Sequence, residues 1–151
     1  MFAQNIAGKI GTVAAAGALA LGVGLMAAPA ASASTGNGSC SSTDLCVYDA
    51  THFNTSKGYY DLGTPNDKNF HGKYWYQGDH GYIGDDISSA RGGGGTSCRG
   101  YSLFPHVDFK GIPLNIPKGT QLGTLVYRYG PQVQQVVNYD NIASSYSKYG
   151  C

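Results

Sequence analysis

The stretch "FPHVDFKG", residues 104–111, consists of an aromatic residue, six further residues and a glycine. An earlier stretch, "YDATHF" (48–53), places its two aromatic residues at the same spacing as the two phenylalanines of the first. Gly58 then corresponds to Gly111, although the earlier copy carries three extra residues before its glycine. The same short unit is therefore written twice in this chain.

The two copies also end alike, with "DDISSA" (85–90) and "DNIASSY" (140–146). They cover about residues 45–90 and 101–146, and "RGGGGTSCRG" (91–100) joins them. A unit of this size cannot bury an aromatic face alone, so each copy needs the other to form a core. We expect the two copies to pack into one domain, residues 34–151.

The composition predicts strands and tight turns rather than helices. The chain has 23 glycines and 12 tyrosines and no glutamate, a balance that disfavours helices and suits short strands. Short apolar or aromatic runs are separated by turn residues. The predicted strands are 45–50, 58–62, 73–76, 101–106, 112–116 and 124–129. The fold class is therefore all-β.

Residues 1–33 have the pattern of an export signal. Lys9 precedes an almost entirely apolar run at 10–28, and "ASA" (31–33) fits a small-x-small cleavage site. We expect cleavage after Ala33, or alternatively after Ala30, and a secreted protein with no stable membrane insertion. An uncleaved membrane anchor is the alternative, because the apolar run is long enough to span a bilayer.

All four cysteines follow the predicted signal: Cys40, Cys46, Cys98 and Cys151. An even number of cysteines outside the cell predicts disulfides, and four cysteines allow three pairings. Proximity in sequence favours Cys40 with Cys46, which leaves Cys98 to pair with Cys151. The sequence has neither a C-x-x-C pair nor a Cys/His cluster at ligand spacing, so a zinc site is not favoured over disulfides.

The net charge and the sequence motifs bear on two classes of function, nucleic-acid binding and catalysis. A net charge of +1 without a basic stripe gives no reason to expect a nucleic-acid partner. No local nucleophile motif such as G-x-S-x-G is present, so we do not expect an enzyme. The segment "FHGKYWYQGDHG" (70–81) gathers two histidines and Trp75 among tyrosines. It is either a zinc- or sugar-binding face or an aromatic strand with a polar hairpin.

The aromatic-x6-Gly hairpin, the "DNIASS" motif, the early Cys-x5-Cys and the export signal together resemble a known family. The chain is similar to the secreted actinomycete βγ-crystallin-like proteins grouped with the Streptomyces metalloproteinase inhibitor. The resemblance implies two Greek-key motifs that form one βγ-crystallin-like sandwich domain. It covers nearly all of the chain after the predicted signal.

The resemblance also implies calcium binding between the two copies. Each ion would take a serine hydroxyl from one copy and Asn/Asp and backbone oxygens from the other. The implied ligands are Asp85, Asp86, Ser88, Asp140, Asn141 and Ser144. The second copy fits the motif fully, whereas Gly84 stands where the first copy should have its first Asn/Asp. The alternative is that the serines and acidic residues only brace turns.

Three functions follow from this interpretation. The first is a monomeric inhibitor that binds an extracellular protease stoichiometrically, with Cys98 and Arg99 as the equivalent of the family's reactive bond. The four glycines at 92–95 oppose it, because an inhibitor loop must be rigid before binding. The second is a calcium-stabilised extracellular structural or envelope protein without a protease partner. The third is a carbohydrate-binding module that uses the tyrosines and Trp75.

Overall fold

The computed structural model describes residues 34–78, 81–129 and 135–151. The predicted signal peptide, 1–33, lies outside these residues. The described part consists of antiparallel strands and two single-turn 3-10 segments, which confirms the all-β prediction. None of its helical segments is long and apolar enough to cross a membrane.

The first sheet has the strand order β2-β1-β3-β6. Its members are β1 (Leu45–Tyr48), β2 (Tyr59–Leu62), β3 (Ser89–Gly92) and β6 (Gln121–Leu122). The first three belong to the first sequence copy, but β6 belongs to the second. It pairs antiparallel with the outer edge of β3, where Ala90 lies opposite Leu122. One strand therefore crosses over from the second copy.

The second sheet has the order β5-β4-β9. Its members are β4 (Gly100–Phe104), β5 (Leu114–Pro117) and β9 (Ser145–Tyr149), all from the second copy. Asp67 of the first copy bridges Tyr146 on the free edge of β9, with backbone hydrogen bonds in both directions. Each sheet thus receives a contribution from the other copy, so the two halves are interlocked.

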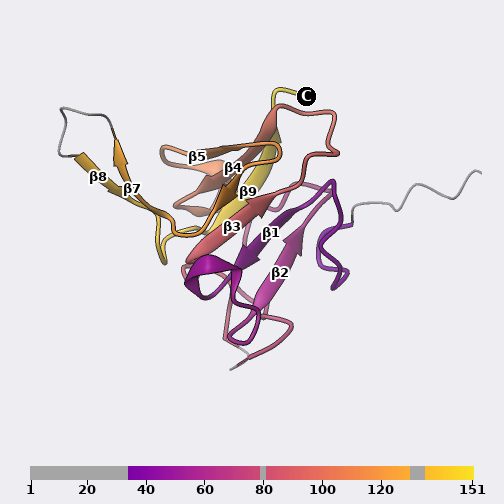
Figure 1. Ribbon diagram of the computed structural model, residues 1–151, viewed down its shortest axis with the longest axis vertical. Coiled ribbons are helices and arrows are strands. Elements are labelled where there is room, and N and C mark those ends of the chain that lie inside the picture. The colour runs from indigo at the N-terminus through magenta and orange to yellow at the C-terminus, as the bar shows by residue number, and fades with distance from the viewer. Residues whose placement is uncertain (1–33, 79–80, 130–134) are drawn as a thin grey trace, which may run out of the picture.

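A separate two-stranded ribbon extends from this body. It is formed by β7 (Val126–Tyr129) and β8 (Gln135–Asn138), which pair only with each other among the described strands. Figure 1 shows the ribbon projecting away from the two sheets. The chain returns from it directly to the "DNIASSY" segment.

The core lies between the two sheets. Its largest fully buried side chains come from both copies: Leu45, Leu62, Phe70, Ile83, Ile87, Tyr101, Leu103, Ile116, Leu125 and Tyr146. Burial, with a smaller contribution from the nearby Asp44 carboxylate, raises the pKa of Tyr101 to about 12. Its hydroxyl donates a hydrogen bond to the carbonyl of Gly93. Neither copy supplies a complete core alone.

The strand predictions hold for five of the six runs. The exception is 73–76, where Tyr74 forms only an isolated bridge with Tyr82. The prediction of a strand there is wrong because backbone hydrogen bonds instead fold the segment into an irregular hairpin. Lys73 donates to Phe70, and Trp75 donates to Gly81. Tertiary contacts override the strand preference of these aromatic residues.

Both predicted disulfides, Cys40–Cys46 and Cys98–Cys151, are present, and the described residues contain no free cysteine. The sequence predicts that the second copy ends near residue 146, but β9 continues to Tyr149. The Cys98–Cys151 bridge therefore fastens the end of a paired strand to the segment before β4.

The glycine run 92–95 is fixed by hydrogen bonds rather than loose. Gly93 N–H donates to the carbonyl of Asp44 at 2.8 Å, and Gly95 N–H donates to the carbonyl of Ser42 at 2.7 Å. A Cβ atom at Gly93 would lie 2.2 Å from the same Ser42 oxygen. The glycine at this position is needed for close backbone approach, which corrects the expectation of a non-rigid connection.

Candidate functional site

The second serine of each Ser-Ser pair braces a folded hairpin. Ser89 donates a hydrogen bond to the carbonyl of Ala50 at 2.6 Å and accepts one from the N–H of Phe53 at 3.1 Å. These groups flank the 3-10 segment η1 (Thr51–Phe53), where His52 and Phe53 adopt positive φ. The serine hydroxyl thus stabilises a backbone conformation that non-glycine residues seldom adopt.

Ser145 does the same in the second copy. Its hydroxyl donates to the carbonyl of His106 at 2.6 Å and accepts from the N–H of Phe109 at 3.2 Å. The segment between them, η2 (Val107–Phe109), has the same pair of positive φ values. The turn-brace interpretation therefore describes the second serines in both copies.

We expect Ser145→Ala to lower the free energy of unfolding by about 2 kcal/mol, because two backbone groups lose a partner. Chemical denaturation measures the change. Ser147→Ala, further along the same strand, is the control and should alter stability by less than about 0.5 kcal/mol. Equal effects of the two substitutions would contradict the bracing role of Ser145.

The first serine of each pair reaches the other copy instead. Ser88 Oγ lies 3.4 Å from Asn141 Oδ1, and Ser144 Oγ donates to Asp85 Oδ1 at 2.6 Å. Asp85 and Asn141 occupy equivalent positions, with φ of 60° and 56°. Asn and Asp tolerate this left-handed region better than most residues. The two expected cross-copy pairs are both formed, while ion binding by them stays a prediction.

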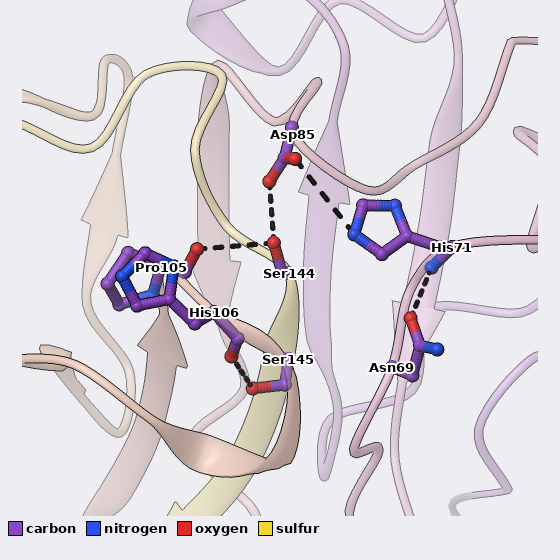
Figure 2. A network of polar contacts seen from close by, with 7 residues as sticks. All are labelled: Asn69, His71, Asp85, Pro105, His106, Ser144 and Ser145. Atoms are coloured by element: carbon purple, nitrogen blue, oxygen red, sulfur yellow. Dashed lines mark hydrogen bonds and ion pairs between the residues drawn. The ribbon is translucent and has the colours of Figure 1, made fainter.

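The two cross-copy contacts differ in quality. The 2.6 Å contact between Ser144 and Asp85 is a short, well-formed hydrogen bond, and Ser144 Oγ also lies 3.2 Å from the carbonyl of Pro105 (Figure 2). At 3.4 Å, the Ser88–Asn141 contact is longer than an O–H···O bond usually is. The second-copy motif thus leaves two oxygens close together but poorly bonded to each other.

The remaining predicted ligands, Asp140 and Asp86, differ in their surroundings. Asp140 Oδ1 is buried without any hydrogen-bond partner in the described structure, although its backbone N–H donates to Asn138 Oδ1. Asp86 Oδ2 instead accepts a hydrogen bond from Trp75 Nε1 at 3.1 Å. One buried oxygen of Asp140 is therefore without a hydrogen-bond partner among the described residues, whereas Asp86 is hydrogen-bonded to the indole of Trp75.

Sequence reasoning missed His71 at this site. Its Nε2 lies 4.0 Å from Asp85 Oδ2, and Figure 2 shows the imidazole ring facing the Asp85 carboxylate. A Cβ atom at Gly84 would lie only 2.8 Å from His71 Nδ1. The one available signal was Gly84 itself, since a glycine in place of the motif's Asn/Asp leaves room for another side chain.

No three His, Cys, Asp or Glu side chains gather at metal-binding distance anywhere in the described ranges. A cation between the copies would therefore be held largely by amide, hydroxyl and backbone oxygens. Calcium accepts all of these donors. Few carboxylates imply weak binding, with a dissociation constant on the order of 10⁻⁴ M.

The predicted protease-binding residues lie beside the second disulfide. Cys98 is buried and Arg99 is exposed. Both backbone groups of Arg99 are already used, because its N–H donates to Tyr149 and its carbonyl accepts from Lys118. Protease binding through Cys98 and Arg99 stays a prediction.

The aromatic segment places its tyrosines and its tryptophan differently. Tyr74 and Tyr82 are each 52% exposed, with ring centroids 4.7 Å apart. Trp75 is only 3% exposed and belongs to the core. A sugar face that includes Trp75, as the third function requires, is therefore not available at the surface.

Comparison of the chain with protein-family models, curated proteins and solved structures finds no match in any of the three.

Proposed function

We propose that this protein is a secreted βγ-crystallin-like domain of two Greek-key repeats that binds calcium between them and is stabilised by it. Three features support the fold assignment: the exchange of β6 between sheets, the bridge from Asp67 to Tyr146, and the matching hairpins. The two disulfides are compatible with an oxidising, extracellular location.

The observation that carries the calcium proposal is the second-copy motif. Ser88 Oγ and Asn141 Oδ1 are 3.4 Å apart, and calcium binds oxygens at about 2.3–2.6 Å. One ion can therefore contact both oxygens at an angle of roughly 90°. Asp140, the residue before Asn141, has a buried Oδ1 without a hydrogen-bond partner in the described part of the chain, and buried acceptors are seldom left unsatisfied.

We expect calcium to raise the melting temperature of the wild type by several degrees or more. Calcium at about 100 times its dissociation constant raises the free energy of unfolding by roughly 2.7 kcal/mol. For a chain of this size, this raises the melting temperature by several degrees or more. Calorimetry in chelator and in about 10 mM calcium measures the shift. Asp140→Ala should remove most of it, and Asp85→Ala less.

Ser145→Ala provides the matched control, because it removes a turn brace without touching the proposed ligands. It should lower the melting temperature equally in chelator and in calcium. A wild-type melting temperature that is the same in both conditions would overturn the calcium proposal. The serine pairs would then act only as structural contacts.

Protease inhibition is the second candidate function. The exposed Arg99 directly follows a disulfide-bonded cysteine, which favours a rigid position for its side chain. Arg99 would then act through its side chain, because its backbone groups pair within the sheet. An equimolar assay against trypsin-like and thermolysin-like proteases, with Arg99→Ala as the control, separates this candidate from the calcium proposal.

A further inference from the structure

The first-copy corner differs from the second by a histidine. Gly84 is the residue equivalent to Asp140, and the space beside it is occupied by the His71 ring. A side chain at position 84 would meet both the ring and the backbone N–H of His71, with Cβ distances of 2.8 and 3.3 Å. At this corner the His71 imidazole therefore lies beside the position where the motif has an Asn or Asp.

His71 and Asp85 are arranged as two donors with a space between them. Nε2 and Oδ2 are 4.0 Å apart, which is too long for a hydrogen bond. Zinc binds nitrogen and oxygen at about 2.0–2.2 Å in tetrahedral geometry, so two of its donors stand about 3.4 Å apart, and this pair would have to close by roughly half an ångström on binding. The side chains are 51% and 50% exposed, respectively, so a hydrated ion can reach both.

Surrounding hydrogen bonds hold the Asp85 carboxylate and the backbone of His71 in place. Asp85 Oδ1 accepts from Ser144 Oγ at 2.6 Å, which leaves Oδ2 directed at His71. The backbone N–H of Asp85 donates to the carbonyl of Ala143, and that of His71 donates to Asn69 Oδ1 at 2.8 Å. Figure 2 shows the Asn69, His71, Asp85 and Ser144 side chains around one corner. A hydrogen bond to a ligating carboxylate, like the one from Ser144 to Asp85, is typical of metal sites.

We propose that His71 and Asp85 form a separate site for a divalent transition cation of the zinc class. His71 Nε2 and Asp85 Oδ2 are the protein ligands, and water completes the coordination. Imidazole nitrogen favours zinc, copper or nickel, whereas calcium takes oxygen ligands. The two repeats would then have diverged in cation preference, with calcium at Asn141 and a transition metal at Asp85.

The test uses zinc and copper as probes of the purified protein. We expect calorimetric titration with zinc to give one site, and the copper-loaded protein to show nitrogen hyperfine coupling in its electron paramagnetic resonance spectrum. His71→Ala should weaken zinc binding at least about tenfold and remove that coupling. His52→Ala changes an exposed histidine elsewhere and should alter neither measurement.

Gly84→Ala is a second, independent variant. Its methyl group would displace the His71 ring and should weaken zinc binding while both ligands remain in the sequence. Melting in chelator verifies that each variant is folded. Asp140→Ala should leave zinc binding intact while it removes the calcium shift, so the two proposals fail separately. Zinc affinity unchanged by His71→Ala, or no binding of either probe by the wild type, overturns the inference.

Discussion

Removal of the Cys98–Cys151 disulfide in the double variant Cys98→Ser/Cys151→Ser should lower the free energy of unfolding by about 4 kcal/mol. The bridge closes a loop with a sequence separation of 53, and closing a long loop restricts the unfolded chain most. It also fastens the end of β9 beside β4. Since a domain of this size is stable by only about 5–15 kcal/mol, the loss is a large share of the total.

The other disulfide provides the comparison. Cys40→Ser/Cys46→Ser opens a loop with a separation of only 6, and the same loop-entropy relation gives about 2 kcal/mol. Urea denaturation of both double variants measures the difference. A short-loop variant that loses as much stability as the long-loop variant would show that loop closure does not govern the contribution of these bridges.

Gly93→Ala should lower the free energy of unfolding by about 3 kcal/mol, which is at the upper end of the effects seen when a well-packed site is overfilled. The new Cβ would lie 2.2 Å from the carbonyl oxygen of Ser42 and 2.9 Å from that of Asp44. Both contacts are with backbone atoms that already accept hydrogen bonds from the glycine run. Relief of the clash therefore requires breaking the connection between that run and the segment before β1.

Gly94→Ala, at the next position, is the control for this substitution. A Cβ there meets nothing closer than 3.9 Å, and its backbone is not in the positive φ region. Its effect should be near zero or slightly stabilising, because alanine restricts the unfolded chain. Equal denaturation midpoints for the two variants would contradict the close packing described at Gly93.

Much of the fold was predictable because strand runs carry a local signal. The runs that contain β1, β2, β4, β5 and β7 are apolar or aromatic and bounded by turn residues. Four strands were missed: β3, β6, β8 and β9. Among them, β3 and β9 read "SARG" and "SYSKY". Their small and polar residues give weak strand preference, and pairing with β1 and β4 determines their conformation.

The site was partly predictable because the family resemblance implies that a serine of each copy faces the Asn/Asp stretch of the other. Ser88 does contact Asn141, and Ser144 contacts Asp85. The direction of the Asp86 side chain was not predictable in this way, because it depends on the indole of Trp75. The position of His71 was not predicted, because Gly84 shows only that a side chain is missing and not which residue fills the space.

The exchange of β6 between the sheets has a consequence for the order of events in folding. The first sheet is complete only when Ala90 meets Leu122. The edge of the second sheet is covered only when Asp67 meets Tyr146. Both pairs are far apart in the sequence. Proteins dominated by such non-local pairs fold in milliseconds to seconds, far more slowly than helical bundles. Until β6 arrives, the outer edge of β3 is an open template for another chain. The pairing of β6 with β3 is therefore the step that closes this edge to misassembly.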